Sequence, residues 1–152
     1  MNISADDSCE LCRQPGGEIA WADELCRVVR VLGREAADTP GLCRVIWNAH
    51  VREMTDLTAG ERRHLMALVF ATEAALRRHT RADKINLASF GNVVPHLHWH
   101  VIPRYSDDRY FPAPIWAAPR RASAPDRIEV AGAALNQAIM QALAEEQGGG
   151  IV

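Results

Sequence analysis

Short runs of apolar and β-branched residues, broken by turn-forming pairs, occupy the first third of the chain. The runs Glu18 to Ala22 and Leu25 to Val31 flank Asp23-Glu24, a pattern typical of two strands joined in a hairpin. Pro40-Gly41 then favours a turn into a third run, Leu42 to Trp47. The pattern therefore predicts three consecutive β-strands.

The middle of the chain changes to a helical period. Thr58 and Glu61 have the spacing of a capping box, in which each side chain accepts a hydrogen bond from the other residue's backbone N–H. Apolar-face positions then recur every three or four residues, at Leu65, Leu68, Val69, Thr72, Ala75 and Leu76. A second helical pattern runs from Ile128 to Ala142, and Gly148 to Gly150 would end it. We expect one long helix and a closing C-terminal helix.

Two further runs of strand character, Lys84 to Phe90 and Leu97 to Ile102, lie on either side of the turn-favouring pair Gly91-Asn92. The order β-β-β-α-β-β-α predicts an α+β fold, an antiparallel meander of about five strands with the helices on one face. Half of the eight prolines fall between Pro112 and Pro125, which predicts an irregular, extended segment. The length of 152 residues suits a single domain, with residues 112–152 as its proline-rich and helical C-terminal part.

The composition narrows the classes of partner. Seventeen Lys and Arg against nineteen Asp and Glu give a net charge of −2, so no broad basic surface is available for nucleic acid or an anionic membrane. No apolar run reaches the roughly eighteen residues of a membrane span, and residues 1–8 do not have the basic and apolar parts of an export signal. We expect a cytoplasmic protein with no membrane or nucleic-acid partner and with only local recognition of anions.

Three of the six histidines, His96, His98 and His100, occupy alternate positions of one expected strand. Alternate strand residues share a face, so these imidazoles are expected in a row pointing outward, while the residues between them face the core. Surface hydrogen bonding, a three-histidine metal site, and a neutral nucleophilic imidazole with substrate-binding neighbours all fit this spacing. The spacing alone leaves the last two open.

The run His96-Leu97-His98-Trp99-His100-Val101-Ile102 resembles the histidine triad (HIT) motif, His-apolar-His-apolar-His-apolar-apolar, at every position. Gly91-Asn92 takes the place of the family's Gly-Gln, and His50 that of an isolated histidine ahead of the long helix. The resemblance covers roughly Cys9 to Tyr105 and implies a HIT domain over residues 1–111, with a HIT-like fold. It also implies a homodimer with apposed sheets or long helices.

HIT enzymes cleave nucleoside phosphates at the α-phosphorus through a covalent nucleotidyl-histidine. On this chain the resemblance implies His98 as the nucleophile and His100 as a donor to the transferring phosphoryl group. His96 would complete the catalytic triad of histidines, and Asn92 would bind substrate together with His100. No organic cofactor is implied. A neutral imidazole offers a lone pair near pH 7, and phosphoryl transfer depends more on positioning than on a large basic patch.

Three positions depart from the family pattern. Many relatives have Ser or Thr where this chain has Val93, whose side chain cannot donate a hydrogen bond to a leaving group. A weakly basic leaving group needs such help least, which favours a dinucleoside polyphosphate over a nucleoside phosphoramidate as substrate. The family's Gln is shortened to Asn92, and the place of its ribose-binding Asp or Asn falls near Arg34. Val93 and the missing ribose-binding acid favour one alternative, a nucleotide-binding or sensor module with little turnover.

Cys9 and Cys12 are separated by two residues, the spacing of half a tetrahedral metal site or of a redox pair. A thioredoxin-type pair follows a strand and opens a helix, whereas only eight residues precede this one and Pro15-Gly16-Gly17 follows it. A metal site or inert thiols are therefore the better interpretations. In some HIT proteins the isolated histidine and the first triad histidine complete such a site, which implies a structural zinc bound by Cys9, Cys12, His50 and His96.

The remaining cysteines, three tryptophans and the proline-rich segment are considered next as parts of the core, of an interface or of a binding site. Cys26 and Cys43 lie in apolar runs and are expected as small core residues. Tryptophans are expected as core or interface anchors, with a base pocket as the alternative, at Trp21, Trp47 and Trp116. The segment from Pro112 to Pro125 is expected either to lie over an active site or to be a plain connector.

Overall fold

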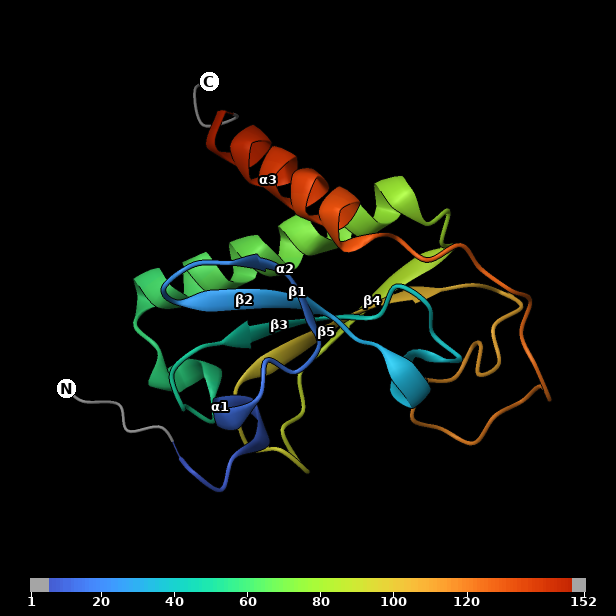
Figure 1. Ribbon diagram of the computed structural model, residues 1–152, viewed down its shortest axis with the longest axis horizontal. Coiled ribbons are helices and arrows are strands. Elements are labelled where there is room, and N and C mark those ends of the chain that lie inside the picture. Colours follow the sequence, from blue (N-terminus) through green and yellow to red (C-terminus); the bar gives the residue numbers. More distant parts are fainter. Residues whose placement is uncertain (1–5, 149–152) are drawn as a thin grey trace.

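The computed structural model describes residues 6–148, which form a five-stranded sheet with helices on both sides. In chain order the elements are α1 (Glu10–Arg13), β1 (Glu18–Ala22), β2 (Cys26–Arg30), η1 (Gly33–Ala36), β3 (Cys43–Trp47), η2 (Met54–Asp56), α2 (Ala59–His79), β4 (Lys84–Ala88), β5 (His98–Arg104) and α3 (Gly132–Gly148). Figure 1 shows α2 and α3 together on one side of the sheet and the short helix α1 on the other. The expected α+β fold is confirmed.

Neighbouring strands are antiparallel throughout the sheet, in the order β1-β2-β3-β5-β4. The first three strands form the expected meander, with boundaries close to the predicted runs. The last two strands depart from a simple meander, because β5 pairs with β3 and leaves β4 at the edge. A long helical crossover between β3 and β4 permits this, since only a short turn forces consecutive strands to be neighbours.

The helix α2 begins where the sequence predicts. The backbone N–H of Glu61 donates to Thr58 Oγ1 at 3.3 Å, and the Thr58 N–H donates to Glu61 Oε2 at 2.7 Å. Each bond satisfies a backbone donor that has no partner within the first helical turn. The predicted inner face is buried at every position, namely Leu65, Leu68, Val69, Thr72, Ala75 and Leu76.

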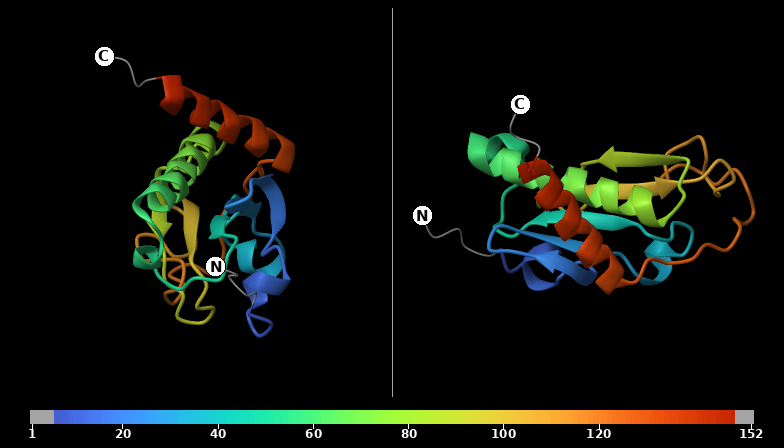
Figure 2. Two further views of the ribbon diagram at one scale, coloured as in Figure 1. Left: turned by 90° about the vertical axis from the view of Figure 1, so that its left-hand side faces the viewer. Right: turned by 90° about the horizontal axis from the view of Figure 1, so that it is seen from above.

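The C-terminal helix α3 packs against α2 and β1; Figure 2 shows it crossing α2 obliquely. It begins at Gly132, later than the pattern predicts, and Ile128 is 94% exposed. The residues just before Gly132 have no regular secondary structure, with Glu129 bound by Arg30 at 2.9 Å and Val130 buried. The helix reaches Gly148, and residues 149–150 of the expected glycine stop lie outside the described residues. None of the described helices is both long and apolar enough to cross a membrane.

The two faces of the sheet have different roles. The face toward α2 carries the main core, which includes Val28 of β2, Val45 of β3 and Val101 of β5. On the opposite face α1 covers one end, where Leu11 packs with Val29 and Ile46. A second small cluster, which contains Val31, Ala36, Leu42 and Ile102, covers the other end. Between these two clusters lies the histidine-bearing part of β5.

Candidate active site and metal centre

His98 and His100 lie at the centre of the sheet face opposite α2. In the β3–β5 and β4–β5 registers His100 is directly across from Arg44 on one side and from Ala88 on the other. Directly paired residues share a face, so Arg44 lies beside the imidazoles, whereas the small Ala88 leaves room above its strand. The alternation of β5 also places Val101 in the main core, as the sequence predicts.

The imidazole of His98 is fixed in one orientation. Its Nδ1 lies 2.6 Å from the carbonyl oxygen of His96, and a carbonyl can only accept, so Nδ1 carries the proton and Nε2 the lone pair. Burial lowers the pKa of His98 below its usual value, and the nearby Arg44 charge lowers the pKa further. His98 is therefore a neutral imidazole at pH 7.

His100 lies one strand position further along the same face. Its ring centroid is 4.9 Å from that of His98, with an interplanar angle of 74°. Burial, and then electrostatic repulsion from Arg44 and from His98 when it is protonated, lower the pKa of His100 from 6.5 to about 3. Its Nδ1 is buried with no hydrogen-bond partner in the described structure.

The structure corrects the expectation of three imidazoles pointing outward in a row. The exposed fractions of His96, His98 and His100 are 0, 8 and 6%. His96 precedes β5, and its side chain turns away from the other two toward the cysteines. The sequence pattern did not show that other segments cover this sheet face.

A cavity of about 730 Å³ opens over His98 and His100. The turn after β4 contributes Asn92 and Val93 to its lining. Gly91 has a φ of 76°, a left-handed conformation that favours glycine, and it starts this turn. Val93 is 92% exposed and offers no donor, as its residue type predicts.

The sequence did not predict an ion pair that lies on the β3 side of this cavity. Glu35 of η1 lines the cavity and forms an ion pair with Arg44, which also donates to the Gly16 carbonyl at 3.1 Å. The expected ribose-binding position near Arg34 thus lies next to a carboxylate. Glu35 could have been found from the sequence, because it is one residue from Arg34, whereas the place of Arg44 beside the histidines follows from the β3–β5 register.

Two aromatic side chains form the β4 side of the cavity. Trp116 lies edge-to-face against His100, with centroids 5.0 Å apart, and against Phe90, with centroids 4.9 Å apart. Trp116 is 50% exposed, so it does not belong to the core, and it lines the cavity. The segment between Pro112 and Pro125 therefore lies over the histidines of its own chain and is more than a plain connector. We call Phe90 and Trp116 the aromatic corner.

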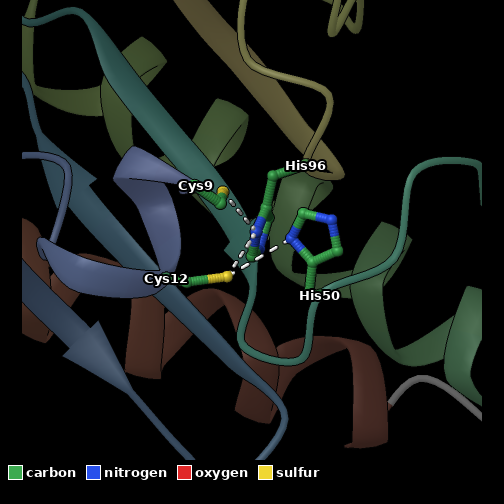
Figure 3. Close-up of side chains that lie close together, drawn as sticks. All are labelled: Cys9, Cys12, His50 and His96. Carbon is green, nitrogen blue, oxygen red and sulfur yellow. Dashed lines mark hydrogen bonds between the residues drawn. The ribbon is translucent and has the colours of Figure 1, made fainter. Parts of the chain in front are cut away.

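Figure 3 shows Cys9, Cys12, His50 and His96 directed toward one another. Their ligand atoms lie within 4.8 Å of each other, and the Sγ···Nδ1 distances are 3.3 Å for Cys12–His50 and 3.4 Å for Cys9–His96. Two ligands of a tetrahedral zinc ion, one sulfur and one nitrogen, are about 3.6 Å apart. The predicted four residues are thus brought together with spacings that suit a metal ion.

The surrounding hydrogen bonds prepare these side chains to bind a cation. His96 Nε2 lies 2.6 Å from the Trp47 carbonyl and must donate to it, so the Nδ1 lone pair faces the cysteines. Arg27 holds the cysteine-bearing segment by donating to the carbonyls of Leu11 at 2.6 Å and Pro15 at 2.9 Å. A fixed tautomer and an anchored loop both favour metal binding.

A second group of possible ligands, Asp23, Cys26 and His64, is better explained as structural. Asp23 accepts from the Cys26 N–H at 2.7 Å and pairs with His64 Nε2 at 2.7 Å. Burial raises the pKa of the Cys26 thiol to about 12, and the three groups are one short of the four ligands of a tetrahedral structural site. Cys26 and Cys43 are both fully buried, as expected for core residues.

Solved structures with this fold are similar to the chain over most of its length. A histidine triad protein from Marinobacter aquaeolei VT8 is 21% identical, covers 93% of this chain and 98% of its own, and has a TM-score of 0.64. A HIT family protein from Bacillus anthracis is 20% identical, covers 96% of this chain and 99% of its own, and has a TM-score of 0.59. A zinc-bound histidine triad family protein from Mycobacterium smegmatis is 20% identical, covers 93% of this chain and 96% of its own, and has a TM-score of 0.55.

These TM-scores, all above 0.5, establish a shared fold. No curated protein matches the chain. The sequence pattern of the HIT domain matches residues 19–107, more than half of the chain and the part that carries β1 to β5. The chain therefore belongs to the histidine triad (HIT) family.

Proposed function

We propose that this chain is a nucleotide hydrolase or nucleotidyl transferase that acts at the α-phosphorus through a covalent nucleotidyl intermediate on His98. The observation that carries the proposal is the 2.6 Å bond from His98 Nδ1–H to the His96 carbonyl, which leaves the Nε2 lone pair on a neutral ring that lines the cavity. An uncharged imidazole with a fixed tautomer is a competent nucleophile at neutral pH.

In the first step the Nε2 lone pair of His98 forms a bond to the α-phosphorus. The bond from phosphorus to the bridging oxygen breaks, and that oxygen leaves with its electron pair as the anion of the departing phosphate group. A polyphosphate anion is a weak base and needs no proton to leave. This fits a cavity rim where Val93 offers no side-chain donor.

In the second step water attacks the same phosphorus. A new P–O bond forms, the P–N bond breaks, the electron pair returns to Nε2, and the proton from water passes to solvent. The Nδ1–H of His98 stays on the His96 carbonyl throughout, so the ring is ready for another cycle. A different acceptor in place of water would make the same chemistry a nucleotidyl transfer.

His100 and Asn92 would hold the non-bridging oxygens of the phosphoryl group during both steps. Both line the cavity, and His100 lies beside the nucleophile. Neutral donors placed in advance stabilise charge that develops in the transition state. On the other side of the cavity the Glu35 carboxylate, held by Arg44, would accept hydrogen bonds from the ribose hydroxyls.

We propose that Cys9, Cys12, His50 and His96 bind a structural zinc ion. Two sulfur and two nitrogen ligands match its preferences, and the similar protein from Mycobacterium smegmatis is zinc-bound. Four protein ligands leave no open coordination position, so the ion would connect the segment of α1 to the start of β5 and take no part in the reaction.

Steady-state hydrolysis by His98→Ala tests the proposal. Diadenosine polyphosphates and adenosine 5′-phosphoramidate serve as substrates, and His64→Ala, which alters a histidine outside the cavity, is the matched control. We expect His98→Ala to lose at least about a thousandfold in kcat while His64→Ala retains activity. Unchanged hydrolysis by folded His98→Ala would refute the proposal.

A second candidate function is a nucleotide sensor that binds substrate with little turnover. The observation that favours it is Val93, which is 92% exposed at the cavity rim and provides no donor for a leaving group. Single-turnover kinetics with the protein in excess over nucleotide separates the two functions. Formation of the His98 adduct followed by its rapid hydrolysis identifies an enzyme, whereas tight binding without cleavage identifies a sensor.

We also propose that the chain forms a homodimer. The strand β4 is at the edge of the sheet, and Phe70 of α2 is 47% exposed. Both features suit an interface in which sheets or long helices are apposed. Sedimentation equilibrium of the purified chain tests this, and a monomer at all concentrations up to about 100 μM would contradict it.

A further inference from the structure

We propose that the aromatic corner formed by Phe90 and Trp116 is a subsite for the base of a leaving group that is itself a nucleotide. This inference rests on the proposed function and adds the identity of the departing half. It assigns Trp116 and Phe90 as specificity residues of the same cavity.

The aromatic corner lies beyond His100 when followed from the nucleophile His98. Ring centroids are 4.9 Å apart from His98 to His100 and 5.0 Å apart from His100 to Trp116, so the rings lead stepwise away from His98. In an in-line displacement the leaving group departs on the side of phosphorus opposite the nucleophile. A group that leaves away from His98 and past His100 comes to Trp116.

One side of the cavity carries charged side chains and the other side carries aromatic rings. The strand order places Arg44 of β3 on one side of β5 and Phe90, which follows β4, on the other, and Trp116 packs against Phe90. Glu10 and Glu35 are also part of the cavity lining. Carboxylates suit the hydroxyls of a sugar and repel a polyphosphate, whereas two aromatic rings suit a planar base.

The aromatic corner is exposed, and the segment that carries Trp116 is held in place by hydrogen bonds. Phe90 is 58% and Trp116 is 50% exposed, so both rings offer uncovered apolar surface to a ligand. The segment that carries Trp116 is anchored, because Arg104 donates to the Ala113 carbonyl at 2.7 Å and Arg121 donates to the Phe111 carbonyl at 3.0 Å. A surface that is already ordered loses little conformational freedom when a base stacks on it.

Two substrates that differ only in the leaving base test the inference. Diadenosine tetraphosphate and adenosine 5′-tetraphosphate both transfer AMP to His98, but only the first releases a group that carries a base. For Trp116→Ala we expect kcat/KM to fall about tenfold or more with diadenosine tetraphosphate and less than about twofold with adenosine 5′-tetraphosphate. Trp116→Phe, which keeps an aromatic face, should retain most of the wild-type preference.

The second chemical step supplies an internal control. Hydrolysis of the nucleotidyl-His98 adduct occurs after the leaving group has gone, so its rate should be the same in Trp116→Ala and the wild type. Ile128→Ala removes a 94% exposed apolar side chain of the same C-terminal region away from the cavity, and it should change neither substrate.

The outcomes separate this inference from the proposed function. Equal losses of kcat/KM for both substrates in Trp116→Ala, or slowed hydrolysis of the adduct, would overturn the inference while the covalent mechanism stands. Absence of any adduct in the wild-type protein with either substrate would overturn both. Selective loss with diadenosine tetraphosphate, with rescue by Trp116→Phe, supports the aromatic corner as the site of the leaving base.

Discussion

The Nδ1 of His98 lies 2.6 Å from the backbone carbonyl of His96, whose own imidazole lies 3.4 Å from Cys9 Sγ and 3.5 Å from Cys12 Sγ. One residue thus joins the two centres, with its side chain in the cysteine–histidine cluster and its carbonyl on the proposed nucleophile. A displacement of the His96 backbone would therefore disturb both the cluster and the carbonyl that fixes the His98 tautomer.

Loss of the metal should therefore affect His98 without direct contact. In Cys9→Ser we expect the zinc content to fall from one ion per chain to near zero and the melting temperature to fall. The chemical shifts of the His98 ring should also change. In His98→Ala, zinc should remain at one ion per chain, because His98 is outside the four-residue cluster. Loss of zinc in His98→Ala would instead support a three-histidine metal site.

The stability of the fold should depend on pH through His100. The unfolded chain protonates this histidine near pH 6.5, whereas burial keeps the pKa of the native side chain at about 3. Below pH 6.5 the unfolded state therefore binds a proton that the native state does not, and stability falls as the pH falls. We expect the urea midpoint of the wild type to decrease more between about pH 7.5 and 5 than that of His100→Gln.

His100→Gln is a suitable comparison for this pH effect because it leaves the cysteine–histidine cluster intact, so protonation of metal ligands affects both proteins alike. Parallel pH dependences of the two urea midpoints would show that His100 is not held neutral by burial.

A buried ion pair, Arg104–Asp108, supports the segment that carries the aromatic corner. The two side chains are 2% and 9% exposed, and the Arg104 Nε donates to Asp108 Oδ2 at 2.8 Å. Burial alone would raise the pKa of Asp108, but the bonds from Arg104 and from the backbone N–H groups of Tyr110, Tyr105 and Phe111 together lower it. Asp108→Asn leaves a buried guanidinium without its counter-charge, and we expect the free energy of unfolding to fall by about 3 kcal/mol.

Asp107→Asn is the matched control for this prediction. Asp107 is the neighbouring aspartate, its side chain is 53% exposed, and it pairs with Arg127 at the surface. Its replacement should change the free energy of unfolding by less than about 1 kcal/mol in urea titrations. Similar losses in both variants would mean that burial of the Arg104–Asp108 pair does not increase its contribution to the free energy of unfolding.

Glu35 should recognise the ribose of the transferred nucleotide. A hydrogen bond to a charged group contributes about 1.5 to 3 kcal/mol, so Glu35→Ala should raise KM by roughly tenfold or more. Removing the 2′-hydroxyl and 3′-hydroxyl from the substrate should raise KM of the wild type by a similar factor and add little in Glu35→Ala. Additive effects of the mutation and the deoxy substrate would place the sugar elsewhere.

The sequence predicted the local elements and the grouping of the chemistry-bearing residues. The capping box of Thr58 and Glu61 and the alternation of the β5 residues depend on contacts within a few residues, which a linear pattern reveals. The four metal-site residues, by contrast, came from family resemblance, since no periodicity connects Cys9 to His50 or His96. The structure brings those four together.

What the sequence did not reveal depends on contacts between distant segments. Burial of His98 and His100 needs α1 and the segment around Trp116 to cover one sheet face, and neither leaves a periodic signal there. The exchange of β4 and β5 in the sheet order likewise follows from how α2 crosses the sheet. A tryptophan among prolines gives no sign of whether it faces a core or a cavity.

The covalent adduct on His98 is the central claim, and mass spectrometry of a reaction quenched rapidly at alkaline pH, where the acid-labile P–N bond survives, tests it most directly. After mixing wild-type protein with diadenosine tetraphosphate and quenching within one turnover, we expect a fraction of intact chains to gain the mass of one AMP. Peptide mapping should place that AMP on His98, and His98→Ala should show no adduct while remaining folded. An AMP adduct on another residue, or rapid hydrolysis with no adduct at any quench time, would contradict the account.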